Sequence, residues 1–284
     1  MTDTRRTTRR SEPGVALRNV LRLRAGGSES LLDAIAEEVP IAMQYNQVPF
    51  AVMMASPADL EDFALGFSLS EGLIRTAAEL ERVAIREHLE GIELSMSVSA
   101  TAPASDLDPA NMRLLPGRAG CGICGTRVLE GLIPPLAPLA TTGAYPVASL
   151  RKALATLAQH QPMNQATGAT HAAAWADASG GIQLLREDVG RHNALDKLIG
   201  AMHRNGVMRT DGALLISSRA SHEMVSKAAM AGIGIVAAVS APTALAIDVA
   251  RSLGICLLGF ARSDGYNVYS CPERLLVDEA DAPR

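Results

Sequence analysis

Two cysteines in a C-x-x-C spacing are the residues of this chain best suited to covalent chemistry. They are Cys121 and Cys124 in the segment RAGCGICGT, which begins at Arg118, holds three glycines and is followed by Arg127. The thiolate is the nucleophilic form of cysteine, and neighbouring positive charge favours it. Glycines let the backbone pass close to a partner. The segment therefore predicts a reactive sulfur site on a loop, although half of a structural zinc site and a thioredoxin-like redox pair share the spacing.

The other two cysteines, Cys256 and Cys271, stand alone in the sequence. Four cysteines arranged in this way do not make the disulfide framework of a secreted protein, so a reducing cytoplasm is expected. Cys256 lies in an apolar run and is expected to be a buried, inert thiol, while Cys271 has no predicted role. No apolar run approaches the roughly 18 residues of a membrane span, and the N-terminal arginines are not followed by the apolar stretch of a signal peptide.

The composition indicates a globular protein with an aliphatic core. Hydrophobic residues make up 48% of the 284 residues, but aromatic residues only 3%. The formal net charge is -4, which argues against general binding to nucleic acid or to membrane surfaces. A phosphate-bearing ligand would therefore have to meet a local cluster of basic residues.

The first part of the chain predicts a small α+β domain over residues 15–116, preceded by a disordered tail over 1–14. An alternating apolar pattern from Val15 to Arg24 predicts a strand. Two strand pairs are predicted around short turns, namely 40–45 with 48–54 and 83–87 with 92–98. Between the pairs, SPADLEDFALGF predicts an amphipathic helix that is capped by Ser56 and packs on the first hairpin.

The second part predicts an α/β domain. Residues 117–146 are assigned to the cysteine loop and a proline-rich linker, and residues 147–284 to the domain itself. A helix at 147–159 and a hairpin of 169–176 and 182–186 come first. Helices at 189–204, 221–231 and 242–253 then alternate with apolar strands at 213–218, 235–240 and 255–260. Such alternation predicts a largely parallel sheet covered by helices on both faces, so the expected fold class is α/β, and α+β for the whole chain.

Polar residues gather where these predicted strands end. The carboxyl ends of parallel strands share one edge of a sheet, and helix N-termini attract anions, so the clusters predict a rim suited to a phosphate-rich ligand. They are Glu187, Asp188, Arg191, His192 and Asn193; Ser217, Ser218, Arg219, Ser221 and Glu223; Ser240 and Thr243; and Arg262, Ser263, Asp264 and Gly265.

Each cluster also has a structural interpretation. Serine, threonine and aspartate commonly cap helices, and Glu223 with Lys227, or His192 with Asp196, would be ordinary i, i+4 pairs. His171 lies among alanines in a predicted strand and is expected to be a hydrogen-bonded core histidine. His192, near a helix start, is expected to face the ligand.

Six segments, in order along the chain, resemble the FdhD family: RAGCGICGT, THAAAW, EDVGRHNALDK, SRASHEMVSKAAMAGI, SAPTALAI and GFARSDGYNVY. The likeness runs from about residue 15 to residue 277, and EDVGRHNALDK and CGICG are its most specific parts. Two positions depart from the family pattern. Ala169 stands where glycine is usual, which alters a turn, and Ser218 stands where glycine or threonine is usual, which could alter the rim near Arg219.

The resemblance implies a sulfur carrier, a sulfurtransferase needed for formate dehydrogenase activity. A cysteine desulfurase would place a persulfide on Cys121, Cys124 would assist or resolve it, and the sulfur would pass to the molybdenum cofactor that carries guanine dinucleotides (bis-molybdopterin guanine dinucleotide). The family's cofactor-binding stretch corresponds here to Phe260, Ala261, Arg262, Ser263, Asp264 and Gly265. The basic residues of the rim expected to bind the cofactor phosphates include Arg191, His192, Arg219 and Lys227. The family also implies a homodimer.

The second domain further resembles the cytidine-deaminase fold, which offers a rival function. A zinc deaminase needs an H-x-E helix and a later P-C-x-x-C, and the corresponding places hold His192-Asn193-Ala194 and Ser218-Arg219-Ala220-Ser221. Deamination and its zinc site are therefore rejected, and the fold is retained. Two other functions stay open: a non-catalytic chaperone of the molybdenum cofactor whose C-x-x-C is structural, and a dithiol oxidoreductase, whose usual tryptophan or proline context the glycine-rich loop lacks.

Overall fold

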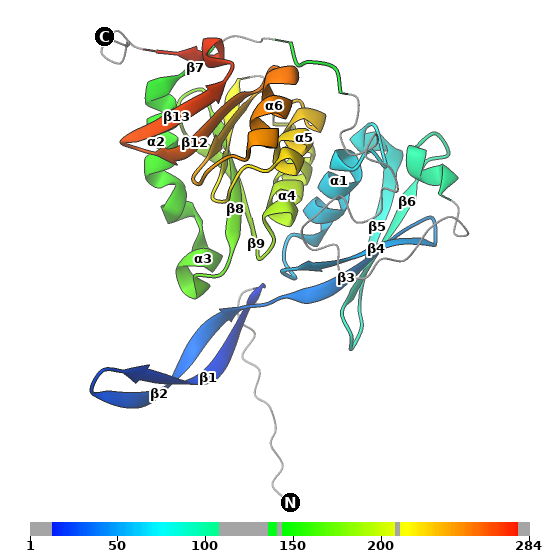
Figure 1. Cartoon of the computed structure of the whole chain (residues 1–284). Helices are drawn as coiled ribbons and strands as arrows, with labels where there is room; N and C mark the ends of the chain where they lie inside the picture. The colour runs from blue at the N-terminus through cyan, green and yellow to red at the C-terminus, as the bar shows by residue number, and fades with distance from the viewer. Residues whose placement is uncertain (1–12, 108–135, 141–143, 208–210, 278–284) are drawn as a thin grey trace, which may run out of the picture.

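The computed structural model describes residues 13–107, 136–140, 144–207 and 211–277. Figure 1 shows a helix-covered sheet from the second half of the chain beside a smaller sheet from the first half, with a long hairpin projecting from the pair. Among the described residues, no helix is long and apolar enough to cross a membrane. Mixed α/β architecture was the predicted fold class, and it is confirmed.

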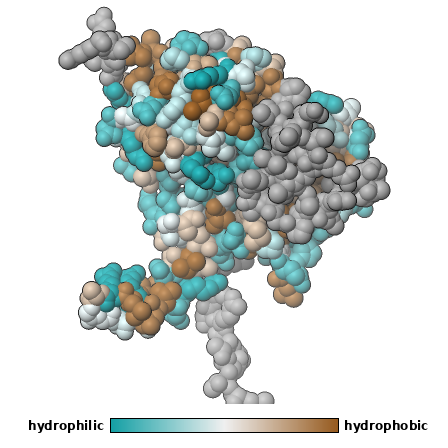
Figure 2. Space-filling model, viewed as in Figure 1, coloured by the Kyte–Doolittle hydropathy of each residue, from teal (hydrophilic) through white to brown (hydrophobic). Residues whose placement is uncertain are grey.

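The projecting hairpin consists of β1 (Val15–Arg24) and β2 (Gly27–Ala36), paired antiparallel along their whole length. The prediction of a strand at 15–24 is confirmed. Its partner was not predicted, because GSESLLDAIA carries no clear alternation and only one β-branched residue. Several leucines of this hairpin are exposed, and Figure 2 shows them as a hydrophobic patch on its surface.

A four-stranded sheet in the order β4-β3-β6-β5 forms the core of the first half. Its strands are β3 (Val39–Tyr45), β4 (Val48–Ala55), β5 (Leu80–Glu87) and β6 (Ile92–Val98). Both predicted hairpins are therefore confirmed. The first turns at Asn46 and Gln47, which adopt φ of 46° and 70° although neither is glycine. Asn46 compensates for this strain, because its amide exchanges two hydrogen bonds with the backbone of Val98.

Helix α1 (Leu60–Ser70) follows this hairpin, as predicted, but Ser56 does not cap it. The N-cap is Asp59, with φ 53°, and Ser56 is fully buried four residues before the helix starts. One face of α1 packs on the hairpin, where the Phe67 and Phe50 rings lie 6.0 Å apart. Single 3-10 turns follow at η1 (Ala77–Glu79) and η2 (Pro103–Asp106). Ser56 is a residue type that commonly caps helices, but in this structure it makes other contacts.

A six-stranded sheet in the order β13-β12-β11-β10-β8-β9 forms the core of the second half. Its strands are β8 (His171–Asp177), β9 (Ile182–Asp188), β10 (Gly212–Ile216), β11 (Ile235–Ala238), β12 (Cys256–Arg262) and β13 (Gly265–Ser270). Only the β10–β11 and β11–β12 pairs are parallel, so the prediction of a largely parallel sheet is wrong. The β8–β9 hairpin joins β10 antiparallel, and β12 turns back at Ser263 and Asp264 into β13, which was not predicted.

Helices cover both faces of this sheet, as predicted. Helix α2 (Val147–Thr156) packs on one face, and α4 (Arg191–Arg204), α5 (His222–Met230) and α6 (Ala244–Ser252) pack on the other. Shorter elements complete the layers: η4 (Leu157–His160), α3 (Pro162–Thr167), η5 (Pro272–Arg274) and the paired strands β7 (Tyr145–Pro146) and β14 (Leu275–Leu276). This order of elements is compatible with the resemblance to the cytidine-deaminase fold.

The two halves share a continuous hydrophobic core, which passes from the four-stranded sheet through α1 and α4 to the six-stranded sheet. At the crossing of α1 and α4, a Cβ atom on Gly66 would lie 1.7 Å from the Asp196 carbonyl oxygen, and one on Gly200 would lie 2.0 Å from that of Asp62. The helices can approach this closely only because both residues are glycine. The domain boundaries at 116 and 147 stay predictions.

Candidate functional site

The predicted sulfur site, Cys121 and Cys124, lies outside the described residues. The described chain packs on the protein core at both sides of that segment, through Leu107 before it and through Leu136 and Leu139 after it. The Arg274 guanidinium donates hydrogen bonds of 2.9 and 3.1 Å to the carbonyls of Leu139 and Ala140. The polypeptide that carries the cysteines therefore begins on the first half of the protein and ends on the second.

The predicted polar rim occupies one edge of the six-stranded sheet. Pairing of His171 with Asp188, Ala173 with Ile216, Ile216 with Ala238, and Ala237 with Leu258 sets the carboxyl ends of β9, β10, β11 and β12 side by side. The start of β8 lies at the same edge. The ends of these strands therefore share one edge of the sheet, as predicted, although the sheet contains both parallel and antiparallel pairs.

The predicted cofactor-binding stretch forms one end of this rim. Phe260 has φ 53°, a rare backbone conformation for a residue other than glycine. It is also 51% exposed, which is unusual for an aromatic residue. Its N–H donates to the Ser240 carbonyl at 3.1 Å, so the bend that follows β11 holds the strained backbone. The Arg262 guanidinium donates to the carbonyls of Val239 and Ala261. Strain of this kind is concentrated at ligand sites, and an exposed ring offers a stacking surface.

A small cavity of about 140 Å³ forms the other end of the rim. His171, Arg191 and His192 line it, together with Glu38, Met54, Val189, Gly190 and Asn193. His192 Nε2 lies 3.0 Å from Glu223 Oε2 on α5, although not in hydrogen-bonding orientation. Arg191 Nε is buried and has no hydrogen-bond partner among the described residues. The structure therefore brings Arg191 and His192 together, as predicted, and adds His171, which sequence reasoning assigned to the core.

Burial, reinforced by the charges of Arg191 and His192, lowers the pKa of His171 below its usual value. The unfolded chain then binds the proton more tightly, so this group's contribution to stability is complete above about pH 6.5 and is lost as the pH falls toward the folded-state pKa. We expect His171→Gln to reduce the loss of stability between pH 7.5 and pH 5.5, measured by urea denaturation. The exposed His160→Gln variant serves as the control. An equal loss in wild type and His171→Gln would contradict this assignment.

Several residues of EDVGRHNALDK turn inward and join the two halves instead of facing ligand. Asp188 and Lys197 are fully buried and form an ion pair of 2.7 Å. Lys197 Nζ also donates to the Ser56 carbonyl at 2.9 Å, and Ser56 N donates to Asp188 Oδ2 at 3.0 Å. The Asn193 amide donates to Asp188 Oδ1 and to the Met54 carbonyl. These contacts hold the segment between β4 and α1 against the start of α4.

Lys227 belongs to a second buried network across the same interface. Its ammonium group donates to Ser70 Oγ at 2.8 Å, to Glu71 Oε1 at 2.7 Å and to both carboxylate oxygens of Asp196. Burial by itself would lower the pKa of Lys227, but Asp196 and Glu71 raise it, so the ammonium stays charged. The predicted i, i+4 pair with Glu223 is wrong, as is the pair of His192 with Asp196, because each side chain takes a partner on another helix.

Two further carboxylates are bonded within the protein, Asp62 across the two halves and Glu187 inside the second half. Asp62 of α1 binds Arg186 at 2.6 Å and Arg204 at 2.9 Å. Glu187 accepts hydrogen bonds from the N–H groups of Met163 and Asn164 and from the Thr170 hydroxyl. Glu187 therefore anchors α3 and is not available on the rim.

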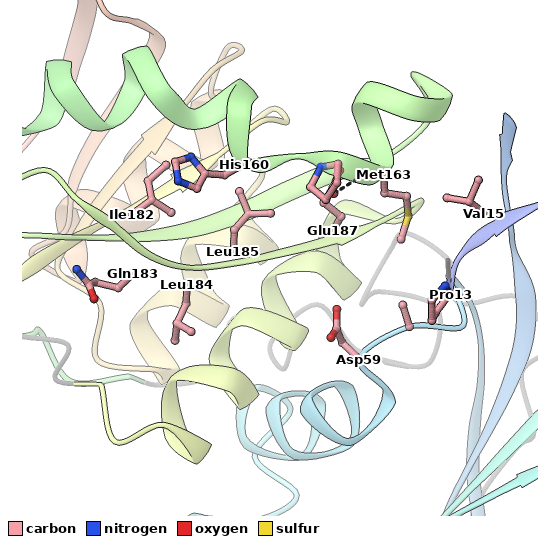
Figure 3. A pocket seen from close by; sticks show the side chains of 12 residues that line it. Pro13, Val15, Asp59, His160, Met163, Ile182, Gln183, Leu184, Leu185 and Glu187 are labelled. Carbon is pink, nitrogen blue, oxygen red and sulfur yellow. Dashed lines mark hydrogen bonds between the residues drawn. The ribbon is translucent and has the colours of Figure 1, made fainter. Parts of the chain in front are cut away.

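A larger groove of about 440 Å³ lies beside Glu187, between β9, α3 and the base of β1. Figure 3 shows Ile182, Leu184 and Leu185 along its wall and the Glu187 hydrogen bond to Met163 within it. The groove is lined by both apolar and polar residues, and within the described chain none of the residues predicted to bind the cofactor lines it.

The remaining predicted residues have simple surroundings. Arg219, Ser263 and Asp264 are exposed on the rim, and Ala261 is buried beneath it. Cys256 is a buried free thiol, as predicted, and burial raises its pKa to about 12. In the described part of the chain, no group of three or more His, Cys, Asp or Glu side chains could hold a metal ion.

Comparison with known proteins gives consistent results. The FdhD/NarQ family model matches residues 36–276. A sulfur carrier protein FdhD from Xanthomonas euvesicatoria pv. vesicatoria (strain 85-10) is 50% identical over 271 residues, covering 95% of each chain. Its counterpart from Bordetella petrii is 47% identical, covering 90% of this chain and 92% of its own. A crystal structure described as a formate dehydrogenase accessory protein from Desulfotalea psychrophila has a TM-score of 0.72 at 25% identity, covering 93% of this chain and all of its own. The chain therefore belongs to the FdhD/NarQ family.

Proposed function

We propose that this chain is a sulfur carrier, a sulfurtransferase that serves formate dehydrogenase. The Cys121 thiolate would attack the terminal sulfur of a cysteine desulfurase persulfide, releasing the desulfurase thiolate and leaving a persulfide on Cys121. Cys124 would assist or resolve that persulfide. The sulfur would then pass to the molybdenum cofactor with two guanine dinucleotides, before the cofactor enters formate dehydrogenase. The reducing cytoplasm is the setting we assign to this exchange, because a C-x-x-C pair stays in its free dithiol form there.

The observation that carries this proposal is the rim at the carboxyl edge of the six-stranded sheet, in a chain whose relatives are named sulfur carriers. Phe260 offers a ring for stacking on a guanine base, and the stretch from Phe260 to Gly265 offers backbone groups beside it. Arg191, His192 and Arg219 lie along the same rim and suit phosphate groups. Lys227, bonded to three side chains, would support the wall of this site.

The test is transfer of sulfur to the protein. The chain is incubated with a cysteine desulfurase and cysteine, and its intact mass is measured with and without reductant. We expect a reducible gain of one sulfur atom on wild type and on Cys256→Ala, whose thiol is buried, and no gain on Cys121→Ala. An equal gain on Cys121→Ala would refute the assignment. Full activation of formate dehydrogenase by a Cys121→Ser, Cys124→Ser variant would favour the cofactor chaperone instead.

We also propose a homodimer, and the projecting hairpin supports it. By its register, one face carries Leu17, Leu21 and Leu23 from β1 and Leu32 and Ala34 from β2, with Asn19, Ser28 and Ser30 between them, and these four leucines are 40, 63, 73 and 57% exposed. The opposite face carries charged pairs such as Arg18 with Asp33. An isolated two-stranded hairpin is marginal in water, so its apolar face requires a permanent cover, and a second copy of the chain supplies one.

Charges on the apolar face should separate the copies. We expect a Leu21→Asp, Leu23→Asp variant to elute and sediment as a monomer, while wild type is a dimer, measured by light scattering and analytical ultracentrifugation. Arg22→Ser, on the other face, is the matched control and should remain dimeric. A monomeric wild type would refute the homodimer, and a variant that still dimerises would show that another surface forms it.

A further inference from the structure

The rim has two chemically different ends. At one end, β12 presents the exposed Phe260 ring. At the other, the start of β8 and the start of α4 present His171, Arg191 and His192. Strands β11 and β10 separate the two ends. Three inter-strand spacings make the separation roughly 14 Å, which exceeds the size of a single phosphate and suits a nucleotide with its base and phosphates extended.

The cationic end has polar groups that lack protein partners. Arg191 Nε and the Oγ of Ser221, the residue before α5, are buried and make no hydrogen bond within the described chain. Both α4 and α5 begin there, at Arg191 and His222, and within the described residues no side chain caps either helix. Buried donors without partners are rare in folded proteins, and uncapped helix N-termini favour anions.

The acidic groups around the cavity are already engaged or lie at its edge. Asp188, directly below, is bonded to Lys197, Asn193 and the Gly190 N–H. Glu223 lies 3.0 Å from His192 Nε2 and is therefore already paired with a residue of the cavity wall. Glu38 also lines the cavity and is exposed to solvent. The interior therefore presents Arg191 and two imidazoles to whatever enters.

We propose that the cavity lined by His171, Arg191 and His192 is a phosphate subsite, separate from the Phe260–Gly265 stretch, which would take the base of the same nucleotide. This inference rests on the proposed function for the choice of a guanine nucleotide. It assigns the direction of that nucleotide along the rim. It also adds His171 to the site, and it adds Glu223 as a positioning residue beside His192. Arg191 would donate through Nε, and the first turn of α4 would donate through its backbone N–H groups.

The test uses GDP, guanosine and inorganic pyrophosphate with the full chain, by isothermal titration calorimetry. We expect Arg191→Gln and His192→Asn each to weaken GDP binding about tenfold or more, to abolish pyrophosphate binding and to leave guanosine binding unchanged. Phe260→Ala should weaken GDP and guanosine alike and spare pyrophosphate. Glu223→Gln should weaken GDP binding less than His192→Asn. Arg251→Gln, exposed on α6, is the matched control and should bind as wild type does.

The outcomes separate the inference from the proposed function. If GDP binds wild type and both Arg191→Gln and His192→Asn retain its full affinity, the phosphate subsite is refuted. If those two variants bind guanosine as weakly, relative to wild type, as they bind GDP, the subsite is also refuted, because that result would place the base in the cavity. Sulfur transfer to wild-type Cys121 is measured separately, and its failure would refute the sulfur carrier without deciding the direction of the nucleotide. Melting temperatures near that of wild type show that each variant is folded.

Discussion

Gly66→Ala and Gly200→Ala should each prevent the chain from forming a stable native state. Each added Cβ would lie about 2 Å or less from a carbonyl oxygen of the other helix. Backbone atoms cannot rotate away as a side chain can, so α1 and α4 would have to separate and loosen the core that joins the two halves. We expect losses of more than about 3 kcal/mol, measured by urea denaturation, or recovery of the variants only as insoluble protein.

The control for this result is Gly27→Ala. No heavy atom of the described chain lies within 4 Å of the position its Cβ would take, and its φ is not in the left-handed region. This variant should unfold within about 0.5 kcal/mol of wild type. A stable Gly66→Ala protein with wild-type cooperativity would mean that α1 and α4 are further apart than the structure places them.

The sequence predicts most elements of this fold because their signals are local. The helices α1, α2, α4, α5 and α6 and both hairpins of the first sheet follow from hydrophobic period and turn residues. The strands β2 and β13 were not predicted, because each is partly exposed and has mixed polarity. The direction of β8 and β9 in the sheet depends on contacts with β10, far along the chain, and no local pattern encodes it.

The site shows the same division. The positions of polar clusters at strand ends were predictable, since they depend only on where each strand stops. Which of the clustered side chains turn inward to bond within the protein was not predictable. Asp188, Asn193 and Lys197 follow one another closely in EDVGRHNALDK, yet their partners, such as Ser56, lie more than 130 residues away. The place of His171 in the cavity wall was not predicted, because its alanine neighbours indicate a core strand, while it is the first residue of β8.

Lys197→Met should cause the second large loss of stability. The lysine and Asp188 are both fully buried, and the ammonium bridges that carboxylate to the Ser56 carbonyl. Methionine fills a similar volume but leaves the carboxylate with a buried charge that the remaining N–H donors only partly compensate. Removing one partner of such a pair costs about 3–5 kcal/mol, which chemical denaturation would measure directly. Lys152→Met, an exposed lysine on α2, is the control and should unfold within about 0.5 kcal/mol of wild type.

A double variant tests whether the charge is the cause. In Lys197→Met, Asp188→Asn the uncompensated charge is gone. The amide oxygen can still accept from Gly190 and Asn193, which share one carboxylate oxygen in wild type, while the Ser56 N–H on the other oxygen loses its acceptor. We therefore expect the double variant to be more stable than Lys197→Met alone. The loss in the double variant should be smaller than the sum of the two single losses by about 1–3 kcal/mol. If the two losses simply add, the pair contributes through packing and not through charge. Asn193, which bonds to Asp188, also holds the carbonyl of Met54, and Met54 lines the cavity of His171, Arg191 and His192. We therefore expect the double variant to bind GDP more tightly than Lys197→Met does.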